Sequence, residues 1–195
     1  MSNSADTHRN TPRIPLPSPE DMTPEQRRVH DAVVSGPRGA VRGPIRAALH
    51  NPELADRWQQ LGELLRYRTS LAPRHSELAI LVTARHWSCQ FEWYAHEPPA
   101  RKGGVPDAVI EAIRHGRRPA FEDADDETVY QFAAELHRSH FVSDAAYAKA
   151  LARFGVKGVV ELTALCGYYG MVAMTLNAHQ LPLPEGTPPP LPVLK

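Results

Sequence analysis

Helix start and stop signals recur through the middle of the chain, and they constrain the fold more than any other feature. Thr23 can cap a helix whose first turn holds Pro24 and whose Gln26 can complete a capping box. Asn51 and Pro52 repeat this arrangement. The apolar residues that follow recur at intervals of three and four positions, at Leu54, Trp58, Leu61 and Leu65. No part of the sequence has the pattern of strands joined by turns, so we predict an all-α fold.

The same signals place further helices along the chain. Pro73 begins a segment that we expect to be helical to about His96. Pro98 and Pro99 should interrupt it, because proline lacks the amide donor and disfavours helical geometry in the residue before it. Later helices are expected over residues 107–115, 125–140, 143–155 and 156–179. The last of these is apolar nearly all round, which predicts that it is the central helix.

Prolines separate the two ends of the chain from this helical middle. Of the 19 prolines, four lie between residues 12 and 19 and six between residues 182 and 192. Such segments favour extended conformations that either stay mobile or lie across another surface, and the leucines of the C-terminal segment favour the second. We therefore predict one helical domain over residues 22–180, a proline-rich N-terminal arm over residues 1–21 and a proline-rich C-terminal tail over residues 181–195.

Composition narrows the classes of partner. The 195 residues include 22 basic and 22 acidic side chains, so the chain has no excess positive charge for phosphate, and we expect no nucleic acid partner. Two cysteines are too few for a disulfide framework, and the polar first residues lack the order of a secretory signal, which favours a cytoplasmic setting. Polar and charged residues interrupt the long apolar segment near the C-terminus, so we expect no membrane span.

One window, from Glu77 to His96, contains reactive groups at helical spacing. At about 100° per residue, Cys89, Glu92 and His96 would share one face of a continuous helix. A thiol, a carboxylate and an imidazole would then converge, and proteins use these groups for proton transfer and nucleophilic attack. Glu77 lies twelve residues before Cys89 and can join them only if the helix bends or a neighbour brings it in.

This spacing of Glu77, Cys89, Glu92 and His96 resembles the signature of the carboxymuconolactone decarboxylase and alkyl hydroperoxide reductase D-type (AhpD-like) superfamily. Further stretches that look like the family's pattern cover roughly residues 40–180: Gly43-Pro44, Asn51 to Ala55, Gln60 to Gly62, Glu92-Trp93, and Glu161 through Tyr169 to Asn177. The resemblance implies a single-domain antiparallel helical bundle that forms a homo-oligomer, with its site near subunit contacts. It also implies an enzyme that acts on a small-molecule substrate.

The sequence departs from the peroxidase-type members at one position. Those members carry Cys-x-x-Cys, in which one thiol attacks the peroxide and the other resolves it, whereas Glu92 occupies the second position here. Cys166 is distant in sequence, so a two-thiol cycle is in doubt. We therefore interpret the chain first as a cofactor-free acid–base enzyme that acts on a small carboxylate or lactone. His96 would donate or accept the proton with Glu77 as its partner, and Cys89 and Glu92 would form the adjacent polar wall.

Two other functions remain open from the sequence. Cys89 could reduce a hydroperoxide alone, through a sulfenic acid that an external thiol resolves. Alternatively, the chain is a helical oligomer with a binding or scaffold role, because a helix-terminal Glu77, a core Cys89 and a helix-ending His96 all have ordinary structural explanations. His86 with Cys89 and His96 would be an unusual zinc pattern, so no metal is expected.

Overall fold

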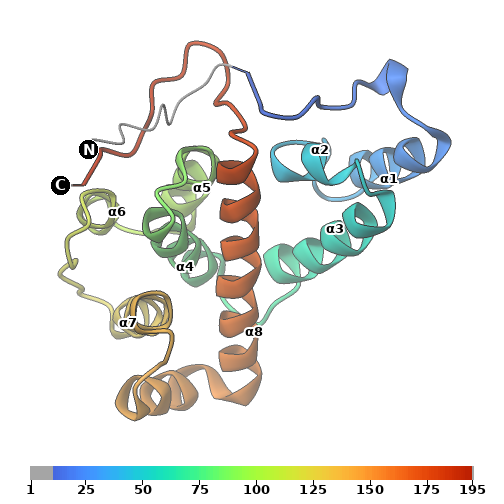
Figure 1. Ribbon diagram of the computed structural model, residues 1–195. Helices are drawn as coiled ribbons and strands as arrows, with labels where there is room; N and C mark the ends of the chain where they lie inside the picture. The colour runs from blue at the N-terminus through green and yellow to red at the C-terminus, as the bar shows by residue number, and fades with distance from the viewer. Residues whose placement is uncertain (1–10, 195) are drawn as a thin grey trace. The chain divides into compact units, whose positions relative to one another are not determined.

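The computed structural model describes residues 11–194, and the regular structure of this part of the chain is entirely helical, as predicted. The elements are, in chain order, the 3-10 helix Pro19–Asp21 and the α-helices α1 (Pro24–Ser35), α2 (Pro44–Ala48), α3 (Pro52–Tyr67), α4 (Pro73–His86), α5 (Gln90–Gly103), α6 (Asp107–Arg114), α7 (Ala124–Ser139) and α8 (Asp144–Ala178) (Figure 1). Apart from the 3-10 helix, the short helix α2 is the element that the start signals did not predict.

The described chain forms two compact units. Unit 1 comprises residues 11–68 and 175–187, and unit 2 comprises residues 69–174 and 188–194. The boundaries at residues 21/22 and 180/181 stay a prediction, and residues 1–10 of the predicted arm lie outside the described part of the chain.

Unit 1 is built around α3, against which α1 and α2 pack. The capping box predicted for α1 is present: the Thr23 hydroxyl accepts from the backbone of Gln26, whose side chain accepts from the backbone of Thr23. Its core includes Val29, Leu49 and Trp58. The described part of the N-terminal arm lies against this unit, because the Arg13 backbone N–H donates to the His179 carbonyl, at 2.9 Å, and the Pro15 carbonyl lies 2.7 Å from the His50 ring nitrogen Nε2.

Unit 2 is organised around α4, where every residue from Ser76 to Arg85 is buried. This helix contacts α5, α6 and α7. Helix α8, which we predicted to be the central helix, leaves several apolar side chains in solvent. Val156 is 71% exposed and Val160 is 62% exposed, while residues on the opposite side of α8, such as Leu162 and Leu165, are fully buried. Helix α8 is therefore a one-sided core helix.

The segment expected to be one helix from Pro73 to His96 is two helices. Helix α4 ends at His86, and α5 begins at Gln90. Between them the chain reverses through Ser88, which has a left-handed backbone with φ of 49°. A reversal of this kind was not visible in the sequence, because the position holds serine rather than the glycine that usually marks it.

The expected interruption at Pro98 and Pro99 is also wrong, since α5 continues through both to Gly103. Each proline removes one helical hydrogen bond, at a cost that tertiary contacts must offset. The side chain of Glu97 supplies such contacts: it accepts from the Trp93 indole N–H at 2.8 Å and from the Arg101 guanidinium at 3.0 Å. The helix is therefore held on both sides of the two prolines by side-chain bonds.

Helix α8 bends sharply where the sequence predicted a boundary. Gly155 has φ of 65° and ψ of 178°, which separates a first segment, residues 144–154, from a longer one (Figure 1). A left-handed φ of this size favours glycine because it has no Cβ. By length and composition α8 resembles a membrane-spanning helix, as the core helix of a soluble protein also does, and 56% of its most apolar window is buried.

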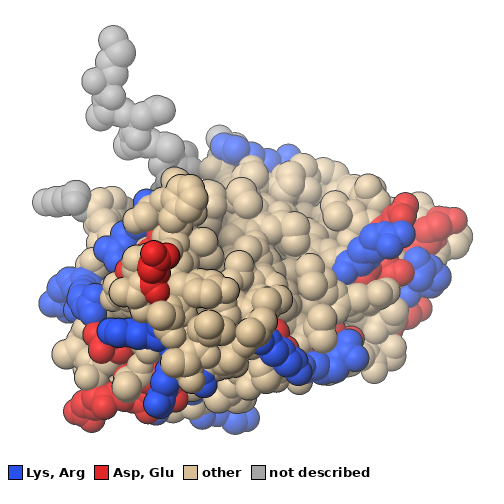
Figure 2. Space-filling model, turned by 90° about the horizontal axis from the view of Figure 1, so that it is seen from below, with Lys and Arg blue, Asp and Glu red and all other residues tan. Residues whose placement is uncertain are grey.

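Charged side chains of both signs are intermixed on the face shown in Figure 2. Many charged side chains of the described residues form ion pairs, such as Arg57 with Glu53 at 2.8 Å and Arg118 with Glu127 at 2.7 Å. Neither sign forms a continuous patch over the described residues on this face, which agrees with the equal numbers of acidic and basic residues.

Candidate functional site

The centre of the candidate site is a buried pair formed by Glu77 of α4 and His96 of α5. The Nδ1 atom of His96 lies 2.7 Å from the Oε2 atom of Glu77, and both side chains are at most 10% exposed. They meet because α4 and α5 pack side by side along much of their lengths. A carboxylate that accepts the Nδ1 proton fixes the imidazole tautomer, so the opposite nitrogen, Nε2, is the one that can exchange a proton with another molecule.

A tyrosine of α8 holds the imidazole from a second side. The rings of His96 and Tyr169 have centroids 4.8 Å apart and cross at 85°, which is an edge-to-face contact. Among the described residues, Glu77 is the one hydrogen-bond partner of His96. The sequence singled out Tyr169 as part of a family pattern and assigned it no place beside His96, because α8 is far from α5 in the chain.

Glu92 lies one turn before His96 on α5, so the two side chains occupy the same face of this helix. Glu92 is 1% exposed, and neither carboxyl oxygen has a hydrogen-bond partner in the described part of the chain. Burial raises the pKa of this carboxyl well above its usual value of 4.5. Burial therefore favours the protonated form of Glu92, which can donate a hydrogen bond, over the carboxylate.

Cys89 is the residue at the N-cap of α5, directly after the left-handed Ser88. Its side chain is buried, with 1% exposure. Burial raises the pKa of the Cys89 thiol far above its usual value, and the nearby Glu92 adds to this rise. The backbone N–H groups of Phe91 and Glu92 oppose the rise but do not overcome it. The sulfur is therefore a thiol at neutral pH, which is the unreactive form.

The second thiol lies in α8 and is equally unreactive. Cys166 is 1% exposed, and burial raises its pKa to about 12, although the Thr83 side chain opposes the rise. Both cysteines are free, so no disulfide links Cys89 with Cys166.

The described end of the C-terminal tail crosses the turn that leads into this site. We call residues 188–194 the C-terminal strap. Three side chains donate to successive carbonyls of the strap: Arg114 to Pro190 at 2.7 Å, Gln90 to Leu191 at 2.9 Å and Arg85 to Pro192 at 3.0 Å. The Leu191 backbone N–H also donates to Gln90, at 2.8 Å, and the Leu191 side chain is 3% exposed. Gln90 follows Cys89 in the chain, so the strap anchors the start of α5.

His86, the third member of the zinc pattern considered from the sequence, takes part in a different contact. Its ring stacks on that of His137 from α7, with centroids 5.0 Å apart and planes at 19°. The Nε2 atom of His137 lies 2.8 Å from the Thr83 hydroxyl. Burial and the neighbouring His86 lower the pKa of His137 from 6.5 to about 4, so this imidazole is neutral at pH 7.

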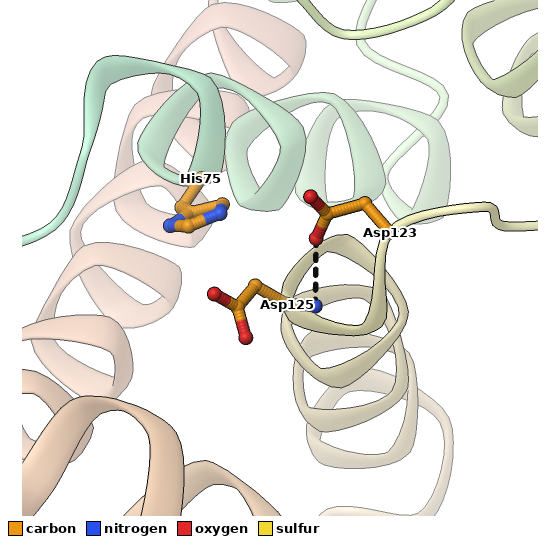
Figure 3. Close-up of side chains that lie close together, drawn as sticks. All are labelled: His75, Asp123 and Asp125. Carbon is orange, nitrogen blue, oxygen red and sulfur yellow. Dashed lines mark hydrogen bonds between the residues drawn. The ribbon is translucent and has the colours of Figure 1, made fainter.

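A further group of ligand-type side chains lies at the start of α7. One atom from each of His75, Asp123 and Asp125 lies within 4.8 Å of the others (Figure 3). Asp123 caps α7 by accepting from the backbone of Asp125, and Asp125 forms an ion pair with Arg153. Helix capping and charge compensation account for this group, so we assign no cation to it.

Comparison with solved structures identifies the class of fold. No protein-family model matches the sequence, and no curated protein matches it. An uncharacterized peroxidase-related protein from Silicibacter sp. TM1040 has a similar structure, with a TM-score of 0.72, 15% identity, and coverage of 93% of this chain and 96% of that one. The alkylhydroperoxidase AhpD core from Ralstonia eutropha JMP134 aligns with a TM-score of 0.71 and 17% identity, over 89% of this chain and 93% of that one.

A third solved structure, the debrominase Bmp8, aligns with a TM-score of 0.69 and 13% identity, over 87% of this chain and 91% of that one. The chain therefore has the AhpD-like fold, and the resemblance drawn from its residues is confirmed at the level of the fold. The similar structures include peroxidase-related proteins and an enzyme that debrominates.

Proposed function

We propose that the protein is a cofactor-free acid–base enzyme that acts on a small carboxylate or lactone, in the manner of carboxymuconolactone decarboxylase. The observation that carries this proposal is the buried pair of His96 and Glu77, 2.7 Å apart, with the buried Glu92 one helical turn away. A carboxyl group hydrogen-bonded to an imidazole, with a second, buried carboxyl group beside them, is a typical arrangement for proton transfer.

The roles follow from which proton each group holds. Glu77 accepts the Nδ1 proton of His96, so Nε2 exchanges a proton with the substrate carbon. Glu92 donates a hydrogen bond to the substrate oxygen on which negative charge develops, and the buried setting strengthens this bond. In a decarboxylation, the bond between the substrate carbon and its carboxylate breaks, and CO2 leaves. The electron pair moves toward the carbonyl oxygen near Glu92, and protonated His96 then delivers its proton to the carbon.

The first experiment measures turnover of γ-lactones that carry a carboxylate, with carboxymuconolactone as the initial substrate. His96→Gln should lower kcat by about 100-fold or more, because it removes the group that transfers the proton. His86→Gln is the matched control, because it changes an exposed histidine of the same unit and should leave turnover unchanged. Equal turnover by the wild type and His96→Gln would reject the proposal.

A second pair of variants tests the protonation state assigned to Glu92. Glu92→Gln keeps a neutral donor at the same position, so we expect it to retain kcat within about tenfold. Glu92→Leu removes the donor and should lower kcat by about 100-fold. If Glu92→Gln were as inactive as Glu92→Leu, the residue would act as a carboxylate, and the mechanism would be wrong in this step.

The alternative function is reduction of a hydroperoxide by Cys89, and the peroxidase-related proteins of similar structure favour it. The burial of the thiol and its raised pKa argue against it, since the thiolate is the form that attacks a peroxide. Stopped-flow mixing with hydroperoxide, followed by chemical trapping of sulfenic acid, distinguishes the two functions. The acid–base proposal predicts no fast oxidation of Cys89.

A further inference from the structure

A groove with a volume of about 360 Å³ lies between α7 and the first segment of α8, residues 144–154. None of its lining residues belongs to the candidate acid–base site. The groove exists because alanines occupy much of the surface between the two helices: Ala124, Ala145, Ala146 and Ala152. Side chains of this size leave space between neighbouring helices that larger residues would fill. The volume suits a small organic molecule and is too small for a folded partner element.

Basic side chains surround this space. Arg118, Lys149 and Arg153 line the groove, against a single acidic lining residue, Glu127. Arg118 is held in place by Glu127 at 2.7 Å and by Gln131 at 2.9 Å, so its guanidinium is fixed and its charge is compensated. Arg153 is compensated in the same way by an acidic residue of α7.

Lys149 differs from the two arginines. It forms no ion pair or hydrogen bond with any residue that the structure describes, so its charge is the uncompensated one. It lies one helical turn after Ala145 and one turn before Arg153, which places all three on the same face of α8. Ser143, the residue before α8, lines the same groove.

We propose that this groove binds a small organic acid with one negative charge, whose carboxylate pairs with Lys149 and whose apolar body lies against the alanines. The ligand has an apolar part because the alanines and the methylene groups of the basic side chains supply most of the walls. It has a single negative charge because two of the three basic groups already have acidic partners.

The test uses the full chain with 13C-labelled alanine methyl groups and benzoate as the probe. Titration should shift the methyl signals of Ala145 and Ala146 in a saturable way, with a dissociation constant on the order of 1 mM. The methyl signal of Ala164, which lies outside the groove, should not move. Benzyl alcohol has the same apolar body without the charge, and its affinity should be lower by about fivefold.

Three variants make the assignment specific. Lys149→Gln should weaken benzoate binding by about fivefold, which is the effect of one exposed ion pair. Lys157→Gln is the matched control, since it removes an exposed lysine of the same helix outside the groove. Ala152→Leu should abolish the shifts by filling the groove, and circular dichroism confirms that the variant is folded.

Either of two results would overturn the proposal. The first is the absence of saturable shifts at the groove alanines with benzoate. The second is an equal loss of affinity in Lys149→Gln and Lys157→Gln, which would mean that benzoate responds only to net charge. Neither result bears on His96 or Glu92, so the groove proposal can be rejected without rejecting the acid–base proposal.

Discussion

Glu92 is the residue whose chemistry departs most from its ordinary state. An acid buried without a hydrogen-bond partner among the described residues lowers the stability of the folded chain whenever the unfolded chain can ionise it. Because burial raises the pKa, the folded chain keeps the proton above pH 4.5 while the unfolded chain loses it. Stability therefore falls as pH rises above 4.5. This cost to stability supports the catalytic role that we propose for Glu92.

The first prediction concerns the stability of Glu92→Gln. The amide has no proton to lose, so the variant should be more stable than the wild type at pH 7 and nearly equal to it at pH 4. The difference should grow by about 1.4 kcal/mol for each pH unit while the folded wild type stays protonated. Urea unfolding at several pH values measures it. A constant difference between pH 4 and pH 7 would contradict the raised pKa.

The lowered pKa of His137 predicts that stability changes with pH in the opposite direction. Its pKa falls from 6.5 to about 4 on folding, so the unfolded chain binds a proton in this range and the folded chain does not. The contribution of His137 to stability is therefore complete above pH 6.5 and is lost as pH falls toward 4, by roughly 2–3 kcal/mol in total. His137→Gln should reduce this loss. The urea midpoints at pH 7 and pH 4.5 measure this loss of stability. The control is His115→Gln, which changes an exposed histidine at the C-terminal end of α6.

At the scale of elements, the C-terminal strap determines how closed the start of α5 is. Gln90 holds the backbone of Leu191 with two hydrogen bonds, of 2.9 and 2.8 Å, and Cys89 lies directly before Gln90. Each of these bonds contributes on the order of 1 kcal/mol, so losing both loosens the strap at Leu191, while Arg85 and Arg114 still hold Pro192 and Pro190.

This predicts that Gln90→Ala raises the reactivity of Cys89. In a Cys166→Ala background, the rate of labelling by a thiol reagent should rise about tenfold or more, because Gln90 supplies two of the four hydrogen bonds that hold the strap. The matched control is Gln90→Ala in a Cys89→Ala background, in which labelling of Cys166 should be unchanged. If both thiols reacted faster to the same extent, the substitution would have loosened the whole unit rather than the strap.

The elements also show how far the sequence alone could lead. Capping residues predicted α1 and α3 because these signals act within a few residues, and the glycine at 155 predicted the bend in α8. The turn at Ser88 and the continuation of α5 through Pro98 and Pro99 depend on tertiary contacts, so local signals could not predict them. For the site, spacing identified Glu77 and His96 as candidates, but only the packing of α4 on α5 places their atoms 2.7 Å apart.

At the scale of the whole molecule, α8 presents an apolar stripe to solvent. Val156, Val160 and Met174 are 71, 62 and 47% exposed, and their spacing along the helix places them on one side. Exposed apolar residues in a row are typical of an interface between protein chains. We therefore propose that the chain forms a homo-oligomer through this side of α8, as the family resemblance implied.

The corresponding prediction is that Val160→Asp shifts the assembly toward the monomer. A charge placed in an apolar interface costs several kcal/mol, so the dissociation constant should rise by about 100-fold or more. Sedimentation or light scattering over a range of concentrations measures this change. Val193→Asp changes a more exposed valine outside the stripe, at 86%, and should leave the assembly intact. A wild type that is monomeric at all concentrations would refute the proposal.

The course of the backbone through the two units restricts how the protein can be divided. The chain passes from one unit to the other after residues 68, 174 and 187, so each unit is assembled from two separate stretches. A single cut at any position therefore leaves at least one of them without a piece of itself. Unit 1 in isolation would have to be built by splicing two fragments together, whereas residues 69–194 contain all of unit 2 along with the stretch of unit 1 at residues 175–187.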